Sequence, residues 1–356
     1  MTSVGLTGYG RYTPDEVVTG EEIAAESGIP EDVVVEKMGM REKRVCPPDD
    51  DHVTDMSIAA GEDALAAAGV DPTEVDLLLY HGSEYKDYVV WSAAANIAER
   101  IGAENAYATE SYTLCAGCPI ALRTVRSQLV ADSIDTALVL TASREEDLLE
   151  YTDEESSFMF NFGSGAAAYV LEADPEEDRT RAWVHESAAI TDGSFSEDVI
   201  MPAGGSRNPT SEDTLDQDLH HLTVPDPEGM KKRIAPVSLP NYLSVTEDAL
   251  AESGYDRSDL DFVAVTHMKR SFHHTLFEEL GAIAVFPGAR TPQDDGSFLQ
   301  DCFVFPGGST AEEFAYFLHT DIGEGFLHAH DVRTERQIGA DTELSHRDVI
   351  EITTTN

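Results

Sequence analysis

The chain has 356 residues, and its 68 acidic side chains against 23 basic ones give a formal net charge of −45. This charge excludes nucleic acid and acidic membrane surfaces as partners, because their phosphates would be repelled. No apolar run approaches the roughly 20 residues that are needed to cross a bilayer, and the first residues contain no secretory signal. We therefore expect a cytoplasmic protein.

The acidic residues are spread along the chain rather than gathered in a tail, and only 6 of the 23 basic residues are Lys. Diffuse carboxylates with scarce Lys are typical of a protein that stays soluble in molar salt, where the Debye length falls to about 3 Å and self-repulsion is screened. The composition favours a halophilic cytoplasm over an acid-binding or metal-buffering role. It also makes any cluster of basic residues more informative than usual.

Helix and strand signals alternate along the chain. The first pair is an Ala-rich helix that ends at Gly69, followed by an apolar strand over 77–80. The later signals predict, in chain order, helices over 92–101 (with Ser92 as N-cap) and 116–131, strands over 136–141 and 166–171, and a surface loop over 204–221. This order favours α/β layers in which helices cover a mostly buried sheet.

Residues 62–77 and 247–262 form an internal repeat. At an offset of 185 positions, 8 of the 16 aligned residues are identical. Each copy has the pattern of a helix, a Gly C-cap, a polar turn and an apolar strand, and the second strand is expected over 262–265. The two strands lead to His81 and His267. The repeat predicts a duplicated fold.

Cys46, Cys115, Cys118 and Cys302 are too few for a disulfide framework. An apolar segment delivers Cys115 to the start of the helix over 116–131, where the helix dipole favours the thiolate. The position predicts a nucleophile. Two other interpretations stay open: a small buried core residue and, because Cys115 and Cys118 form a C-x-x-C pair, a redox or zinc site.

Two further features could contribute to a site. His267 ends the second predicted strand, where a His can move a proton near neutral pH; a purely structural His is the alternative. Residues 161–166 form a Gly-rich turn at which backbone segments must approach closely. The turn is not a phosphate loop, because no Lys-Ser/Thr pair follows it.

Together these residues resemble the thiolase superfamily, specifically ketoacyl-acyl-carrier-protein synthase III and its relatives. The resemblance covers about residues 3–281. It is carried by five segments whose order and spacing agree with the family: M-G-M-R-E-K-R at 38–44, L-C-A-G at 114–117, F-G-S-G-A-A at 162–167, T-D-G-S at 191–194, and V-T-H-M-K at 265–269, where the family has H-Q-A-N.

The resemblance implies a thiolase-like duplicated five-layer α-β-α-β-α fold. Its N-terminal half, 1–180, would carry the nucleophilic Cys, and its C-terminal half, 181–356, would carry the catalytic His. The implied enzyme is an acyltransferase that forms carbon–carbon bonds by Claisen condensation. Cys115 would take an acyl group from a thioester, and His267 would donate a hydrogen bond to the thioester oxygen of the second substrate. The resemblance implies a homodimer and no metal or cofactor, with a coenzyme A thioester as substrate.

The chain departs from the family pattern near its C-terminus. The family's third catalytic residue is an Asn in a G-N-T-S-A segment, and the nearest match, 307–311, has Gly308 in that place. The H-Q-A-N motif has become H-M-K-R over 267–270, which disfavours a decarboxylating malonyl donor. A non-catalytic thiolase-fold scaffold subunit therefore stays open as an alternative.

Residues 81–85, H-G-S-E-Y, are similar to the G-S-E segment of hydroxymethylglutaryl-CoA synthase, a sister family. In that family the Glu is a general acid/base beside the Cys and the His. The similarity makes Glu84 a candidate assisting acid/base and gives a hydroxymethylglutaryl-CoA synthase-like enzyme as the second functional hypothesis. A solvated carboxylate is the alternative for Glu84, and the Cys115 motif favours the synthase III side.

Basic residues gather at 37–44, 231–233 and 269–270. Arg and Lys pair well with the phosphates of coenzyme A, and the resemblance places the first and third groups at the mouth of the pantetheine tunnel. Ordinary surface charge balance is the alternative. We expect an acyl-CoA or an acyl-carrier protein as partner, with acyl-CoA preferred. The expected substrate-binding residues are Lys37, Arg41, Lys269, Arg270, Phe162 and Gly163.

Overall fold

The computed structural model describes residues 2–355 except 132, 261–262, 267–269, 288–302, 319, 333, 335 and 346–347. The chain divides into two compact units, Met1–Ala235 and Pro236–Asn356. The first unit contains β1 (Val4–Tyr12), β2 (Val17–Thr19), α1 (Gly20–Ser27), β3 (Glu42–Arg44), α2 (Val53–Ala68), β4 (Leu77–His81), α3 (Ala93–Ile101), β5 (Tyr107–Ser111), α4 (Gly117–Val130), β6 (Thr136–Ser143), β7 (Gly165–Ala173), β8 (Ala182–Trp183), α5 (Glu212–Asp216) and α6 (Pro227–Ile234).

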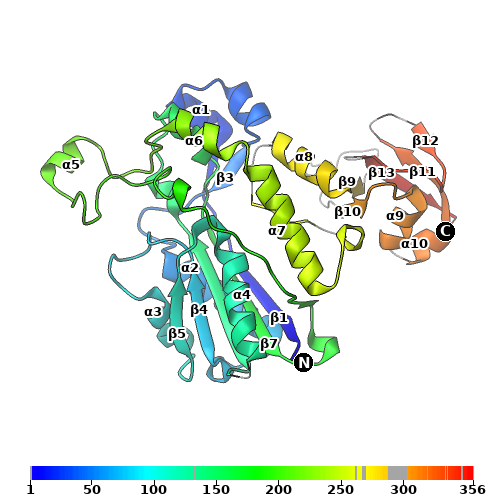
Figure 1. Ribbon diagram of the computed structural model, residues 1–356, viewed down its shortest axis with the longest axis horizontal. Helices are drawn as coiled ribbons and strands as arrows, with labels where there is room; N and C mark the ends of the chain where they lie inside the picture. Colours follow the sequence, from blue (N-terminus) through cyan, green and yellow to red (C-terminus); the bar gives the residue numbers. More distant parts are fainter. Residues whose placement is uncertain are drawn as a thin grey trace. The chain divides into compact units, whose positions relative to one another are not determined.

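A six-stranded sheet in the order β5-β4-β6-β7-β1-β8 organises the first unit. β4 is parallel to β5 and β6, and β7 runs antiparallel to β6 and β1. Helices α2 and α3 pack on one face, against residues such as Leu78 and Leu138, and α4 packs on the other, against Leu77 and Val139; Figure 1 shows α4 lying along the strands. The first three residues of β4 are all leucine because alternate residues of this strand face helices on opposite sides.

The predicted elements of this unit are found close to their expected bounds. The helix over 92–101 is α3, and the Ser92 hydroxyl caps it by accepting a hydrogen bond from the Ala95 amide at 3.3 Å. The helix over 116–131 is α4, and the strands over 136–141 and 166–171 are β6 and β7. The predicted loop over 204–221 contains one short helix, α5.

The internal repeat is visible in the local structure. Helix α2 ends at Gly69 and α7 (Ser238–Ser253) ends at Gly254, and both glycines are left-handed, with φ of 68° and 82°. A capped 3₁₀ turn follows each helix, at Pro72–Glu74 and at Arg257–Asp259. These features keep the offset of 185 positions found in the sequence. The division of the chain into halves 1–180 and 181–356 stays a prediction.

The second unit combines helical and sheet elements. After α7 it contains α8 (Arg270–Leu280), β9 (Ala282–Pro287), β10 (Phe303–Pro306), α9 (Ala311–Leu318), α10 (Thr320–Glu324), β11 (Phe326–Asp331), β12 (Arg336–Ile338) and β13 (Val349–Thr354). The strand predicted over 262–265 is not found in the described part, because 263–266 have no regular structure and Phe262 lies outside the described residues.

A five-stranded sheet closes the second unit, in the order β10-β9-β13-β11-β12. β13 lies parallel to β9 at the centre, between the antiparallel pairs β9–β10 and β11–β12. Ala311 and Phe314 of α9 pack against Ala329 and Ile350, so this region has a small core of its own.

Within the described ranges, none of the helices is long and apolar enough to span a membrane. The longest, α2 and α7, have 16 residues each, against about 20 for a spanning helix.

Candidate active site

The carboxyl ends of β4, β5 and β6 meet at one edge of the six-stranded sheet. His81, the last residue of β4, pairs in register with Ser111 at the end of β5 and with Thr141 near the end of β6. Because the three strands are parallel, the segments that follow them leave the sheet at the same edge, which is the usual place for a site in an α/β sheet. Two of the three predicted catalytic residues, Cys115 and Glu84, lie in these segments.

Cys115 lies in a tight turn between β5 and α4. The turn is a 3₁₀ segment, Leu114–Ala116, and Leu114 has a φ of 49°, a left-handed conformation that is costly for this side chain. The Cys115 side chain is exposed, Cys118 is half-buried and Cys46 is buried, and all three are free thiols. Burial raises the pKa of the Cys118 thiol and raises that of Cys46 to about 11. Of the described cysteines, the predicted nucleophile is the one open to a substrate.

The helix after Cys115 begins against a buried imidazole. A Cβ at Gly117 would lie 2.6 Å from Nδ1 of His81, so this approach requires glycine. His81 is 3% exposed, and neither ring nitrogen has a hydrogen-bond partner within the described part of the chain. Burial lowers the pKa of His81 to about 4, so the ring is neutral near pH 7. The repeat marked His81 only as the end of a strand, and its place beside the nucleophile turn follows from the strand order.

The loop 82–92 is bound to the strand that leads to Cys115. Lys86 in this loop forms a buried ion pair with Glu110 of β5 and also donates to the Tyr112 hydroxyl. Burial by itself would raise the pKa of Glu110, but hydrogen bonds from Lys86 and from the Ala94 amide, with the charge of Lys86, lower it. The ion pair therefore fixes the loop that carries Glu84, whose own side chain is exposed, relative to the nucleophile turn.

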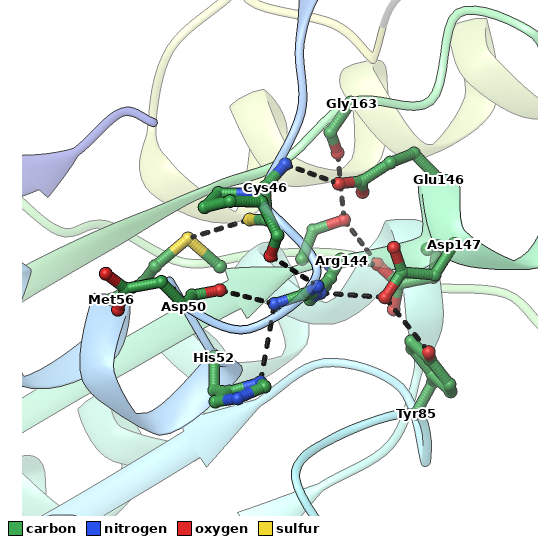
Figure 2. A network of polar contacts seen from close by, with 12 residues as sticks. Cys46, Asp50, His52, Met56, Tyr85, Arg144, Glu146, Asp147 and Gly163 are labelled. Carbon is green, nitrogen blue, oxygen red and sulfur yellow. Dashed lines mark hydrogen bonds and ion pairs between the residues drawn. The ribbon is translucent and has the colours of Figure 1, made fainter. Parts of the chain in front are cut away.

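A polar network centred on Arg144 joins this edge to the N-terminal segment 41–52, as Figure 2 shows. The guanidinium donates to the carbonyl oxygens of Pro47 and Asp50 at 2.9 and 2.6 Å and to the Asp147 carboxylate at 2.7 Å. Arg144 is only 5% exposed. Sequence reasoning missed it because its carbonyl partners lie 97 and 94 positions away and no local pattern marks them.

The basic group at 37–44 divides into exposed and buried members. Lys37 and Arg41 are exposed and could meet phosphates. Lys43 is buried, its ammonium donates to the carbonyl of Phe162 at 2.6 Å, and burial lowers its pKa to about 8. Lys43 therefore holds the Gly-rich turn instead of facing a ligand.

The Gly-rich turn at 161–166 makes the close backbone approach that its sequence predicts. A Cβ at Gly163 would lie 2.9 Å from the carbonyl oxygen of Arg44, and the Ser164 amide donates to the same oxygen at 2.8 Å. Both Phe162 and Gly163 are thus tied to β3 at the end of the segment that carries Lys37 and Arg41.

Three predicted residues cannot be placed against these groups. His267 and Lys269 lie outside the described residues, and Arg270 is described only as the first backbone position of α8. Their predicted roles stay predictions.

Solved structures of condensing enzymes share the fold of this chain. The priming β-ketosynthase of the R1128 polyketide pathway matches with a TM-score of 0.64 at 24% identity and covers 78% of both chains. The 3-oxoacyl-(acyl carrier protein) synthase III of Pseudomonas aeruginosa PAO1 matches with a TM-score of 0.65 at 21% identity, over 78% of this chain and 80% of that one. The protein therefore has the thiolase fold, and the predicted fold class is confirmed.

Sequence relatives narrow this class to a family. The acetoacetyl CoA synthase NphT7 of Streptomyces sp. (strain CL190) is 31% identical over 255 residues, which is 72% of this chain and 74% of that protein. A β-ketoacyl-[acyl-carrier-protein] synthase III of Solibacter usitatus (strain Ellin6076) is 30% identical over 222 residues, 62% of this chain and 66% of that protein. The family model of 3-oxoacyl-[acyl-carrier-protein] synthase III matches residues 110–193, which include Cys115.

The chain belongs to the β-ketoacyl-acyl-carrier-protein synthase III family of the thiolase superfamily, a family of acyltransferases that carry out Claisen condensations. The predicted family and enzyme class are confirmed. The condensing function is supported over the hydroxymethylglutaryl-CoA synthase-like and scaffold alternatives.

The C-terminal region matches a different family. The model of the TGS domain matches residues 284–354, which cover nearly all of the five-stranded sheet. Gly308 lies in the turn between strand β10 of this sheet and helix α9. Its comparison with the catalytic Asn of the condensing enzymes therefore has no support in the fold. The separate sheet also explains why the resemblance to the condensing family ends at about residue 281.

Proposed function

We propose that this protein condenses two acyl thioesters through an acyl intermediate on Cys115. One observation carries the proposal: the exposed Cys115 thiol lies in the strained turn before α4, at the sheet edge that also carries Glu84. Helix α4 begins two residues later, at Gly117.

In the first step the Cys115 thiolate attacks the carbonyl carbon of an acyl-CoA. A carbon–sulfur bond forms at Cys115 and the coenzyme A thiolate leaves. Backbone N–H groups, including that of Cys115, would stabilise the oxyanion that forms after the attack and before the coenzyme A thiolate leaves.

In the second step an enolate of the second thioester attacks the acyl carbon, and Cys115 leaves as a thiolate. His267 would donate a hydrogen bond to the enolate oxygen. Since H-Q-A-N has become H-M-K-R over 267–270, we assign removal of an α-proton rather than decarboxylation, with Glu84 as the base. The thiolate and these proton transfers require neither a metal nor a redox cofactor.

The substrate is best assigned as an acyl-CoA. Lys37 and Arg41, with Lys269 and Arg270, would pair with its phosphates, and the turn at Phe162 and Gly163 would border the pantetheine arm. An acidic carrier protein would need the same basic groups to dock on a chain with a net charge of −45. The same charge supports function in the cytoplasm of a halophile, where molar salt screens it.

A homodimer is supported by the loop 82–92. Tyr88, Val89 and Val90 are three consecutive exposed apolar residues, and Val90 has a left-handed φ of 54°. An exposed apolar tip of this kind is typical of an interaction surface.

The test is intact-protein mass spectrometry after incubation with short acyl-CoAs in molar KCl. Wild type and Cys118→Ala should gain one acyl mass, and Cys115→Ala should gain none. An adduct that persists in Cys115→Ala would move the nucleophile elsewhere. A folded wild type that gains no adduct would favour a carrier-protein substrate or the scaffold hypothesis.

A hydroxymethylglutaryl-CoA synthase-like reaction is the second candidate, favoured by the exposed carboxylate of Glu84 on a fixed loop. The products separate the two reactions. Acetyl-CoA alone should give acetoacetyl-CoA in the first case, and acetyl-CoA with acetoacetyl-CoA should give a hydroxymethylglutaryl thioester in the second.

A further inference from the structure

Five consecutive residues after β4 differ in how they are held. Ser83, Tyr85, Lys86 and Asp87 each bind a residue of another segment through the side chain. Glu84 is exposed, and no partner for its carboxylate is found among the described residues. A short loop fixed at four of five positions presents its fifth side chain in a restricted place, as catalytic groups require.

Two of these contacts lead to the same short segment. Ser83 donates to the Glu145 carboxylate, and the Tyr85 hydroxyl donates to Asp147 at 3.0 Å. Burial, followed by the charge of Asp147, raises the pKa of Tyr85 to about 12, so its hydroxyl stays a donor over the working range of pH. The residues on both sides of Glu84 are therefore held by carboxylates that directly follow Arg144.

Arg144 provides the cation for the Asp147 carboxylate, whereas the Glu145 carboxylate accepts from the Arg144 backbone amide at 3.0 Å and from the Ser143 hydroxyl. The Arg144 guanidinium pairs with Asp147 at 2.7 Å, and its other nitrogens donate to the carbonyls of Pro47 and Asp50 and contact the His52 ring at 3.3 Å (Figure 2). At 5% exposure its charge is poorly screened. Without it, the carboxylates at 145–147 would repel one another and Asp147 would lose the cation that fixes its direction. A planar guanidinium presents its donors to several acceptors in a rigid fork, whereas the Lys ammonium is a compact point charge on a flexible stem.

We propose that Arg144 is a positioning residue for Glu84, acting through the pair Asp147–Tyr85. The inference rests on the proposed function, because it assigns Arg144 to the condensation step in which Glu84 removes a proton. It also predicts that the two half-reactions, acylation and condensation, respond differently to loss of the network. Loss of the network should slow condensation and leave the acylation of Cys115 nearly unchanged.

The experiment measures the two half-reactions separately in the full chain, with acetyl-CoA in molar KCl. Glu84→Gln should lower the kcat of condensation by about 100-fold, the scale of a lost general base, and change acylation of Cys115 less than 2-fold. Tyr85→Phe, which removes only the hydroxyl, should lower the same kcat by about 5-fold, the scale of one lost hydrogen bond. Adding Tyr85→Phe to Glu84→Gln should lower the kcat of condensation no further, because Tyr85 acts through Glu84.

Arg144 itself is tested with two variants. Arg144→Gln should slow condensation at least as much as Tyr85→Phe. Arg144→Lys keeps the charge beside Asp147 and should restore part of the rate. The matched control is Arg179→Gln, since Arg179 also bridges a carboxylate and a carbonyl, those of Glu172 and Ala68, at the opposite end of β7. Arg179→Gln should leave both half-reactions unchanged.

A readout independent of turnover separates the inference from the proposed function. Hydrogen exchange of peptides over 82–92 should be faster in Tyr85→Phe and Arg144→Gln than in wild type and Arg179→Gln. Unchanged exchange in Tyr85→Phe would overturn the positioning role, even if Arg144→Gln failed to fold. The inference would also be overturned if the kcat of Glu84→Gln/Tyr85→Phe fell by the product of the two single losses. The same holds if Glu84→Gln alone left the kcat of condensation unchanged. If hydrogen exchange over 82–92 is slower in wild type than in Tyr85→Phe and Arg144→Gln, but Cys115 of the wild type is never acylated, the proposed function would be contradicted instead.

Discussion

The Cβ position of Gly117 lies 2.6 Å from Nδ1 of His81, so the first residue of the helix after Cys115 is fixed against the last residue of β4. His81 has little room to move away, because it is buried and its strand pairs with β5 and β6 on both sides. The contact sets the start of α4, and with it the turn that exposes Cys115.

Gly117→Ala should therefore destabilise the protein. The added methyl group overlaps a buried ring, and overpacking of this kind costs about 1–3 kcal/mol of the free energy of unfolding. Denaturant titration in molar KCl would measure it, with Gly205→Ala as control, because a Cβ there meets no atom within 4 Å. Equal stability of the two variants would mean that the His81 ring yields easily. Acylation of Cys115 should also slow in Gly117→Ala, since the turn must shift.

The three cysteines in the described part of the chain should react with iodoacetamide in the order of their exposure. Cys115 is exposed, Cys118 is half-buried with a raised thiol pKa, and Cys46 is buried with a pKa of about 11. Because the thiolate is the reactive form, Cys115 should be labelled first and Cys46 last in the native protein, by at least tenfold in rate. Peptide mass spectrometry over a time course measures this order. Labelling of Cys118 ahead of Cys115 would contradict the proposed assignment of the nucleophile.

The ion pair between Lys86 and Glu110 should be costly to break from one side. Lys86 and Glu110 are almost fully buried, with side-chain exposures of 4% and 10%. Lys86→Met leaves a buried carboxylate without its cation and should lower the free energy of unfolding by about 3–5 kcal/mol. Lys86→Met/Glu110→Leu should recover a large part of this loss, because no buried charge remains.

A matched surface pair checks that burial is the cause. Arg100 and Asp55 pair at 2.6 Å, but both side chains are more than 40% exposed. Arg100→Gln should cost less than about 1 kcal/mol. A similar loss in Lys86→Met and Arg100→Gln would contradict the argument from burial.

Local features of the fold could be predicted from the sequence. The continuous apolar run of β4, the Ser92 cap and the glycines that end α2 and α7 depend on neighbouring residues, and all of them are found. Cys115 could be placed before α4 for the same reason. The five-stranded sheet could not be predicted, because its central strand β13 pairs with β9 some 60 positions earlier and no periodic pattern announces such a pairing.

The groups around the candidate site were harder to predict for a related reason. Lys43 and Arg44 are adjacent and chemically alike, yet Lys43 is buried and Arg44 is exposed. Which of the two turns inward depends on the Phe162 carbonyl, 119 positions away, to which Lys43 donates. Basic residues in sequence therefore indicated a cationic region but not which of its members could reach a ligand.

Lys43 should give the protein an unusual dependence of stability on pH. Burial lowers its pKa from an ordinary value of 10.5 to about 8, although the nearby Glu146 carboxylate opposes this shift. Between these two pH values the unfolded chain binds more protons than the folded one, so the free energy of unfolding contributed by Lys43 rises with pH. After allowance for solvent screening, the rise should be on the order of 1–2 kcal/mol from about pH 8 to pH 10.5. Lys43→Met removes the titrating group, and the difference in the free energy of unfolding between wild type and this variant should increase across that window. The exposed Lys37 gives the control: the corresponding difference for Lys37→Met should stay flat, and an equal slope in both variants would show that burial of Lys43 is not the cause.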